Sequence, residues 1–185
     1  GGEAAEGGLW DISGGWMNGT QEQVLSVAVD HGCGAEGLQP PGRGGCVLVG
    51  TSQGRVVQLR RHADGRGRLV PDWAIQQEES AGPGQLHALP GGGVVLSLLP
   101  GRGVLRAADS REGAEVAEWR LPQDVTWTAL GGGGDGYLYF LGRARRGRQR
   151  SARSRVVLWR FPVPPELSAL VQHGRQADVD NHQEI

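Results

Sequence analysis

The sequence predicts an all-β fold made of repeated antiparallel strands, and three observations support this prediction. Short apolar runs alternate with turns along most of the chain, and 33 of the 185 residues are glycine. The runs have the length of strands and are rich in valine and leucine, as is typical of buried strands. A tryptophan also recurs four times in nearly the same local frame, at Leu9–Ile12, Asp72–Ile75, Glu118–Leu121 and Leu158–Phe161.

A common period groups these strands into units. The tryptophan frames, and the short apolar phrases that follow them, recur at roughly 40–47 residues once one stretch is set aside. That stretch, Gly32–Gly45, is rich in glycine and proline and is predicted to be an inserted loop. A period of this length in a β-rich chain indicates stacked four-stranded modules. We therefore expect about three units, at 24–75, 85–121 and 126–161.

The strands of the first two units can be ordered from the sequence. The first unit has apolar runs at Val24–Val29, Cys46–Gly50 and Arg55–Leu59, followed by the frame around Trp73. The second unit repeats this order with Leu86–Leu89, Val94–Leu98, Val104–Ala107 and Val116–Leu121. Glycine-containing turns separate most of these runs, as expected for antiparallel strands in sequence order.

The third unit leaves two alternatives. It has clear strands at Trp127–Leu130 and Tyr137–Leu141, joined by the glycine turn Gly131–Gly136, and a later strand at Val156–Phe161. Either Val156–Phe161 is the third strand and the fourth is missing, or it is the fourth strand and the third is polar. The tryptophan register favours the second alternative.

The Trp10-Asp11 dipeptide, the glycine turns and the tryptophan frames resemble those of a β-propeller that is broadly WD40-like. The resemblance implies blades of about four antiparallel strands within 1–161, with 9–12 as the last strand of a preceding blade. It also implies that Trp10, Trp73, Trp119 and Trp159 pack between adjacent blades. Trp16 and Trp127 fall outside this register and receive no predicted role. The alternative fold is a β-sandwich.

The number of blades predicts an incomplete ring. Three blades are fewer than the ~4–8 of a closed propeller, and an open stack leaves apolar faces and strand edges bare. We expect the chain to be part of a larger propeller protein or complex, or to self-associate so that two copies complete the ring.

The C-terminal segment 162–185 is predicted to leave the propeller as a short helix and a disordered tail. Pro162–Pro165 stops the sheet because proline cannot donate to a strand ladder. The segment 165–174 begins with proline and ends with glycine, which favours a helix. Its Leu-Ser-Ala-Leu phrase instead resembles the first strand of another blade, and this alternative stays open.

Composition limits the classes of partner and compartment. The formal net charge is −1 and all 19 basic residues are arginine, so no global field attracts nucleic acid or membrane. No stretch approaches the ~18–20 apolar residues of a membrane span. A Cys33–Cys46 disulfide and the sequon Asn18–Thr20 would indicate an extracellular setting. Unpaired cysteines and an unused sequon are the favoured interpretation, and with them an intracellular location.

The strongest local charge is a run of seven arginines, namely Arg143, Arg145, Arg146, Arg148, Arg150, Arg153 and Arg155. It is interpreted first as a solvated hairpin loop that contacts other protein chains, together with the Gly32–Gly45 loop. The predicted function is a non-catalytic protein–protein interaction platform. The alternative is binding of phosphate, nucleic acid or another anionic surface through the loop 143–155.

Enzymatic function is the remaining alternative, and the sequence offers little for it. The five histidines share no metal-ligand spacing, no Cys-x-x-Cys occurs, and no cofactor is expected. Asp30 and His31 end one strand and could line a channel, but later repeats place proline and glycine at that point. The Gly131–Gly136 run is a turn, because a strand follows it where a phosphate loop requires a helix.

Overall fold

The computed structural model describes residues 22–30, 46–61, 69–76, 85–100, 102–132, 134–144 and 155–171. These residues form three antiparallel sheets. The first sheet contains β1 (Val24–Asp30), β2 (Cys46–Thr51), β3 (Arg55–Arg61) and β4 (Leu69–Gln76). The second contains β5 (Gln85–Ala88), β6 (Val94–Leu99), β7 (Val104–Asp109) and β8 (Glu115–Arg120). The third contains β9 (Val125–Gly132), β10 (Tyr137–Ala144) and β11 (Arg155–Pro162).

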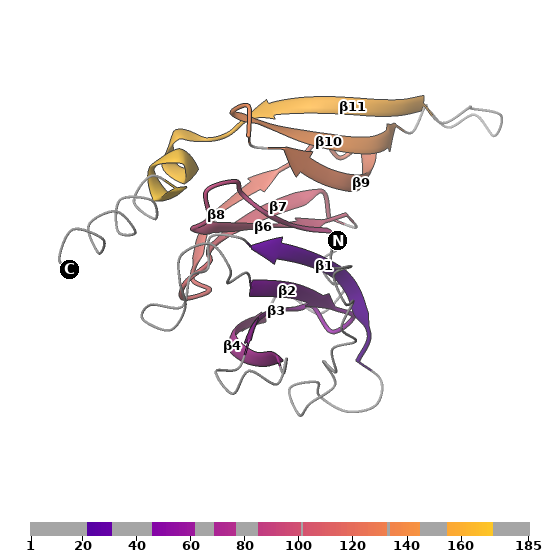
Figure 1. The fold of residues 1–185 in the computed structure, drawn as a ribbon. Helices are drawn as coiled ribbons and strands as arrows, with labels where there is room; N and C mark the ends of the chain where they lie inside the picture. Colours follow the sequence, from indigo (N-terminus) through magenta and orange to yellow (C-terminus); the bar gives the residue numbers. More distant parts are fainter. Residues whose placement is uncertain are drawn as a thin grey trace, which may run out of the picture.

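Each sheet is a meander whose strands lie in sequence order, and the sheets are stacked as propeller blades (Figure 1). The first strands of the three sheets lie beside one another, since β1 contacts β5 and β5 contacts β9. The predicted all-β class of propeller blades in an incomplete ring is confirmed.

The third sheet corrects the prediction for Val156–Phe161. This run lies in β11, which pairs directly with β10, from Tyr137 opposite Pro162 to Ala144 opposite Arg155. It is therefore the third strand, and the described part of this sheet holds no fourth strand. The tryptophan register misled because Trp159 lies opposite Phe140 and faces back toward the second sheet, whereas Trp119 on β8 faces forward.

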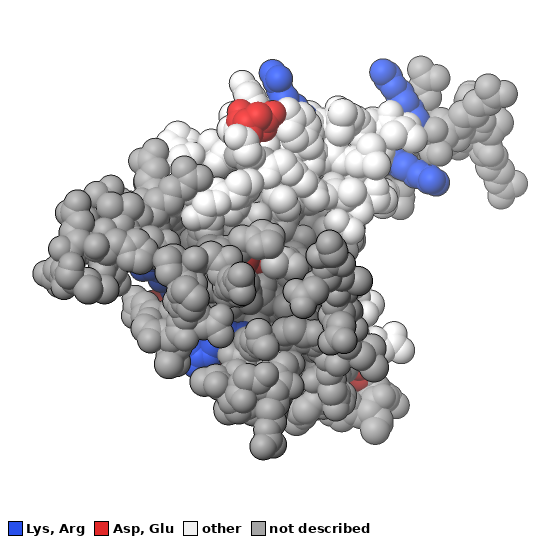
Figure 2. Space-filling view, in the orientation of Figure 1, with Lys and Arg blue, Asp and Glu red and all other residues white. Residues whose placement is uncertain are grey.

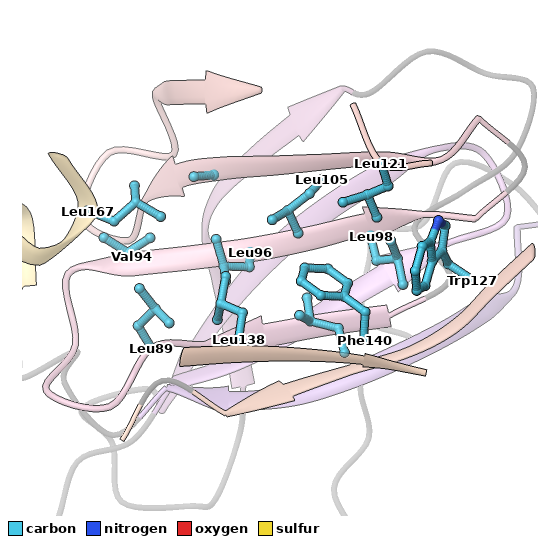
Figure 3. Close-up of a cluster of buried hydrophobic side chains, with 12 residues drawn as sticks. Leu89, Val94, Leu96, Leu98, Leu105, Leu121, Trp127, Leu138, Phe140 and Leu167 are labelled. Atoms are coloured by element: carbon cyan, nitrogen blue, oxygen red, sulfur yellow. The ribbon is translucent and has the colours of Figure 1, made fainter. Parts of the chain in front are cut away.

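The largest core lies between the second and third sheets (Figure 3). Leu96 and Leu98 of β6 and Leu105 of β7 meet Leu138 and Phe140 of β10 there. At one end of this core the rings of Trp127, Phe140 and Trp159 form edge and tilted contacts, with centroids 5.7–5.9 Å apart. Alternation along each strand sends these side chains to one face, so the two sheets are held by apolar burial.

Trp127 is the aromatic anchor that the sequence did not assign. Its side chain is almost fully buried, and its indole Nε1 donates a hydrogen bond to the Pro122 carbonyl at 3.1 Å. A bulge in the pairing of β9 with β10 lies beside it, between Leu141 and Gly142. The bulge changes which residues of β9 face the core, so simple alternation does not predict this position.

A smaller core joins the first and second sheets. Leu48 and Val56 pack against Leu86 and Val95 across this junction. Trp73 closes it, because its Nε1 donates to the Ser110 carbonyl at 2.8 Å. Trp73 thus packs between blades as the resemblance implied, and so does Trp119, whereas Trp10 lies outside the described residues.

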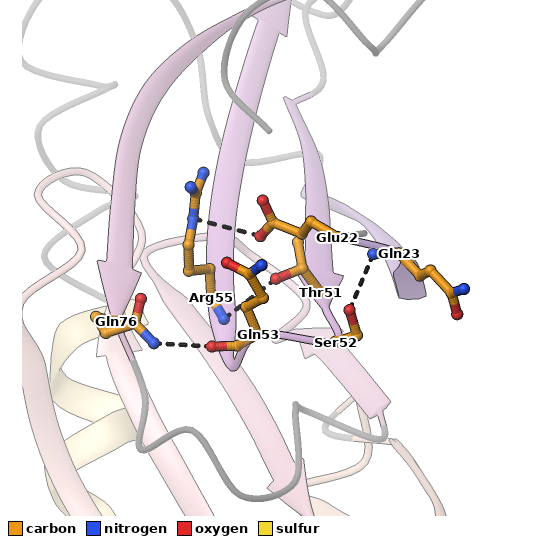
Figure 4. Close-up of polar contacts among 7 residues, drawn as sticks. All are labelled: Glu22, Gln23, Thr51, Ser52, Gln53, Arg55 and Gln76. Carbon is orange, nitrogen blue, oxygen red and sulfur yellow. Dashed lines mark hydrogen bonds and ion pairs between the residues drawn. The ribbon is translucent and has the colours of Figure 1, made fainter. Parts of the chain in front are cut away.

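A polar cluster fixes the turn between β2 and β3 (Figure 4). Ser52 Oγ accepts a hydrogen bond from the Gln23 N–H at 2.9 Å, and Thr51 Oγ1 accepts one from the Arg55 N–H at 3.3 Å. The Glu22 carboxylate, whose side chain is fully buried, lies 3.6 Å from the Arg55 guanidinium. A buried carboxylate requires such a partner, so this ion pair holds the segment before β1 onto the turn.

After β11 the chain forms a short helix over 165–171, as the proline and glycine signals favoured. Leu167 on this helix is fully buried in the core between the second and third sheets. No helix among the described residues has the length and apolar character to cross a membrane. Cys46 is disulfide-bonded, which contradicts the favoured interpretation of an unpaired cysteine. Cys33, the other cysteine of the chain, lies outside the described residues.

Candidate protein-interaction surface

The two ends of the predicted arginine loop are described, and the loop itself is not. Arg143 lies opposite Val156, and Arg155 lies opposite Ala144, at the end of the β10–β11 hairpin where the two strands are connected. Both side chains are exposed. Arg145, Arg146, Arg148, Arg150 and Arg153 lie outside the described residues, as does the Gly32–Gly45 loop. The strand pairing therefore places two of the seven predicted residues at the same end of the hairpin, on opposite faces of the sheet by register.

A different surface stands out in the same sheet. The face of the third sheet that points away from the second sheet is called here the third-sheet outer face. By strand register it contains the following residues: Tyr137, Tyr139, Leu141 and Arg143 of β10, and Val156, Leu158 and Arg160 of β11. Leu141 is 40% exposed, Val156 63% and Leu158 69%. Isolated exposed apolar residues are ordinary, whereas a contiguous group across paired strands is a candidate interaction surface.

The part of this face near Arg143 and Val156 is hollowed. A depression of about 380 Å³ is lined by Thr128, Leu141, Gly142, Arg143 and Val156. Gly142 contributes buried backbone to this lining, and the absence of a side chain there leaves room on the inner face for Val125 and Trp127. Apolar walls with a guanidinium and a hydroxyl at the rim suit a protruding aliphatic side chain.

Aromatic and charged groups fix the end of the face nearest the 134–136 turn. The Arg160 guanidinium lies 4.1 Å from the centre of the Tyr137 ring, as in a cation–π contact. Tyr139 Oη donates a short hydrogen bond to Asp135 Oδ2, and the Tyr137 N–H donates to Asp135 Oδ1 at 3.1 Å. The hydrogen bond from Tyr139 lowers the pKa of the Asp135 carboxyl, and the same bond raises the pKa of the Tyr139 hydroxyl. These contacts link the side chains of Asp135, Tyr139, Tyr137 and Arg160 to one another or to the backbone at this end of the face.

Charge is sparse over the middle of the sheet. In Figure 2 the atoms over β9–β11, at the top of the view, are mostly uncharged, and the charged side chains lie toward the two ends. The surface therefore combines an apolar centre with a polar, partly charged rim, which is the usual composition of a protein interface.

A second hollow, of about 180 Å³, lies along β7 and β8. It is lined by Leu99, Arg102, Val104, Arg106, Glu118, Arg120 and Gln123. The Arg106 Nε lies 2.8 Å from Glu118 Oε2 and 3.8 Å from Glu115 Oε2. Its guanidinium is thus already balanced by carboxylates, which leaves a weaker field for an anion than the residue count suggests.

The groups considered for catalysis do not converge. Asp30 is buried at the end of β1, and His31 lies outside the described residues. His87 Nε2 lies 2.7 Å from the Gly132 carbonyl, which links β5 to β9. No group of three or more His, Cys, Asp or Glu side chains in the described ranges is placed to hold a metal ion.

The sequence contained one signal for this face that was not used. In β11 apolar and charged side chains occupy the same face, with Val156 and Leu158 next to Arg160. A strand that faces a packed neighbouring blade rarely mixes an arginine with aliphatic residues. This signal depends on knowing that β11 is an edge strand, which the sequence alone left open.

Comparisons with known proteins identify no family for this chain. No protein-family model matches the chain, and no curated protein matches it. Among solved structures, hydrazine synthase of Kuenenia stuttgartiensis matches with a TM-score of 0.47 and 15% identity, over 68% of this chain and 41% of that one. A putative 6-phosphogluconolactonase from Bacteroides uniformis matches with a TM-score of 0.46 and 13% identity, over 78% and 43%.

BamB from Moraxella catarrhalis matches with a TM-score of 0.40 and 17% identity, over 76% of this chain and 47% of that one. The chain thus spans less than half the length of each of these three proteins. At such low identity and TM-score the matches support no argument about this chain, and none of their activities is carried over to it.

Proposed function

We propose that this chain is a non-catalytic protein–protein interaction module of the propeller class, part of a larger propeller protein or complex. The observation that carries the proposal is the third-sheet outer face, where Leu141, Val156 and Leu158 remain exposed side by side. The WD40-like resemblance of the tryptophan frames belongs to the same proposal, because such propellers present rigid surfaces to other proteins.

The energetics of this face support binding. Burying a valine or leucine side chain that is exposed gains about 1.5–3 kcal/mol. Tyr139 and Arg160 at the rim belong to the residue types that contribute most at interfaces. They are also fixed by the Asp135 hydrogen bond and the Tyr137 ring, which lowers the entropy lost on association.

Photo-crosslinking from single positions tests the proposal. A photoreactive amino acid at position 158, incorporated in the cells that make the protein, is expected to crosslink to protein chains of discrete mass. The matched control is position 116 on β8, where Val116 is 39% exposed but lies on the second sheet. Equal and diffuse labelling from both positions would show that the third-sheet outer face is not an interaction surface.

Anion binding through the loop 143–155 is the second candidate. One observation favours it. Strand pairing puts Arg143 and Arg155 at the same end of the hairpin, so a guanidinium lies at each end of the loop 143–155. Binding to heparin or RNA should then fall steeply with salt, because phosphate contacts release counterions. Replacing all seven arginines by glutamine should abolish the salt-dependent part of this binding to heparin or RNA. Binding that is unchanged by these replacements would dismiss this candidate.

Compartment and catalysis stay open as predictions. The disulfide at Cys46 weighs against the expected intracellular location, because disulfides persist in oxidising compartments. Counting free thiols in protein isolated without reductant decides this point, since a reduced pair would restore the intracellular expectation. An enzymatic role remains an alternative for which the described residues supply no assembled site.

A further inference from the structure

We propose that the third-sheet outer face binds the same face of a second copy of this chain, so that two third sheets pack face to face. A two-fold axis runs across the strands at the Leu141–Leu158 pair, and β10 of one copy lies antiparallel over β10 of the other. This inference rests on the proposed function, because it names the partner of the same surface.

The register of β10 with β11 divides this face into three rows, each a directly opposed pair of one residue from either strand. In order along β10 the rows are Tyr139 with Arg160, Leu141 with Leu158, and Arg143 with Val156. Neighbouring rows are about 7 Å apart, since they are two residues apart on a strand. A two-fold axis at the middle row therefore stacks the two middle rows and places each outer row on the opposite outer row of the second copy.

The middle row supplies the apolar centre of the contact. Leu141 is 40% exposed and Leu158 is 69% exposed, and both side chains lie on the axis. Stacking the rows covers four leucine side chains in the space of about 10 Å that separates packed sheets. Charged groups stay at the rim on both sides, as in ordinary interfaces with an apolar core.

The shapes of the two outer rows also match. The hollow of about 380 Å³ is centred on β10 at Leu141, Gly142 and Arg143. Tyr139 and Arg143 are both two residues from Leu141, so Tyr139 of the second copy lies over this hollow. Its ring is half-buried, and its hydroxyl is held by Asp135. A rigid aromatic ring that fills an apolar hollow is a typical anchor of an interface.

The same axis joins opposite charges at both ends of the contact. Arg143 is exposed and forms no ion pair with another described residue. Asp135, which accepts the hydrogen bond from Tyr139, is exposed as well. The Arg143 guanidinium of each copy therefore meets the Tyr139–Asp135 pair of the other copy. Two charge-assisted contacts form in each dimer, one at either end.

Electrostatics also selects this axis over one that runs along the strands. The segment 145–154 joins β10 to β11 at the Arg143 end and contains five further arginines. An axis along the strands would put the segments of both copies at the same end of the dimer, where like charges repel. An axis across the strands puts them at opposite ends. Because both copies use the same face, the contact is isologous and closes at two copies.

Light scattering after gel filtration of the 185-residue chain tests the dimer, with circular dichroism to show that each variant stays folded. The wild type is expected near twice 19.6 kDa. Leu158→Arg is expected to give a monomer, because it places two guanidinium groups together at the axis. Val116→Arg is the matched control, since Val116 is 39% exposed but lies on the second sheet, and it should leave the dimer intact.

Charge reversal tests the orientation of the two copies. Arg143→Glu places like charges at both ends and should raise the dissociation constant of the dimer by at least about tenfold. Asp135→Arg should weaken the dimer for the same reason. The chain with both substitutions restores opposite charges and should bind more tightly than either single variant. Arg155→Glu is the control, because Arg155 lies on the other face of the sheet by register.

Two results would overturn this arrangement. A dimer that is lost with Leu158→Arg but unaffected by Arg143→Glu would mean that the copies pair edge to edge along β11. Losses that add up in the double variant would mean that Asp135 and Arg143 do not meet across the contact.

The failure of this inference can be separated from failure of the proposed function. A monomeric wild type that still crosslinks from position 158 to another protein overturns the second copy as partner and leaves the interaction function standing. A monomeric wild type without specific crosslinks from that position overturns both.

Discussion

The two outer faces of the stack differ in how much apolar surface they leave exposed. On the first sheet Val49, Val57 and Leu59 are fully buried, and only the stripe on β1 is exposed. On the third sheet exposed apolar residues lie on β10 and β11, with Leu158 as the most exposed. The third sheet is also the one that lacks a described fourth strand.

The last strands of the sheets show the same contrast. The edge strand β4 carries Pro71, and Asp72 there pairs with Arg60 at 3.3 Å. The edge strand β8 carries Glu118, which pairs with Arg106. Proline and charge are the usual protections of an edge against unwanted pairing. β11 also carries Arg155, Arg160 and Pro162, and it differs from the other two edge strands in exposing Val156 at 63% and Leu158 at 69%.

The largest expected effect comes from replacing one leucine by alanine on the outer face of the first sheet and one on the outer face of the third sheet. Leu59→Ala should lower the free energy of unfolding by about 2–5 kcal/mol, because it opens a cavity at a fully buried site. Leu158→Ala should change it by no more than about 0.5 kcal/mol, because this side chain is 69% exposed. Urea denaturation measures both values. Similar losses for the two variants would mean that the faces are equally covered, and the comparison would fail.

A smaller effect is expected where the first sheet meets the second. A methyl group on Gly113 would lie 2.9 Å from Trp73 Cε3 and 3.2 Å from Ile75 Cγ1, and the φ of Gly113 is +72°. Gly113→Ala should therefore destabilise by about 1–3 kcal/mol beyond the backbone cost. Gly136→Ala is the matched control, since its φ is +81° and nothing lies within 4 Å of the added methyl. Equal decreases in melting temperature for Gly113→Ala and Gly136→Ala would show that Trp73 can move aside and that the first and second sheets pack loosely there.

Much of the fold could be predicted from the sequence, because strand alternation and glycine turns are local signals. The runs Val24–Val29, Val94–Leu98 and Val104–Ala107 all lie within strands of the structure. Eight glycines of the described residues have positive φ, and Gly91, Gly92 and Gly93 are among them in the turn before β6. These positions need glycine for a backbone reason that is visible in the sequence.

The candidate site could not be predicted in the same way, because exposure depends on what packs over a strand. Leu138 and Leu158 are both leucines of apolar runs, yet one is fully buried and the other 69% exposed. The difference follows from which face of the third sheet meets the second sheet. Trp127 was missed because of a bulge, and Trp159 was misplaced because its frame resembles that of a fourth strand. These are tertiary facts that local patterns do not contain.

The smallest expected effect tests whether the rim of the third-sheet outer face is held in place before binding. Tyr139→Phe removes the hydroxyl that donates to Asp135 and should raise the pKa of that carboxyl toward its ordinary value. Tyr137→Phe is the control, because the backbone N–H that donates to Asp135 and the ring beneath Arg160 both remain. Carboxyl-carbon NMR titration of each variant and of the wild type measures the shift in the pKa of Asp135.

The sign of the linked stability effect follows from the lowered pKa. The contribution of Asp135 is present above the pKa of the unfolded chain and is lost as the pH falls through the lower folded value. Tyr139→Phe should therefore reduce the stability that the protein loses as the pH falls through the titration range of Asp135. An unchanged titration of Asp135 in Tyr139→Phe would mean that the hydrogen bond does not persist in solution. The rim would then have to be ordered by its partner, and the third-sheet outer face would differ from the first-sheet face in exposure alone.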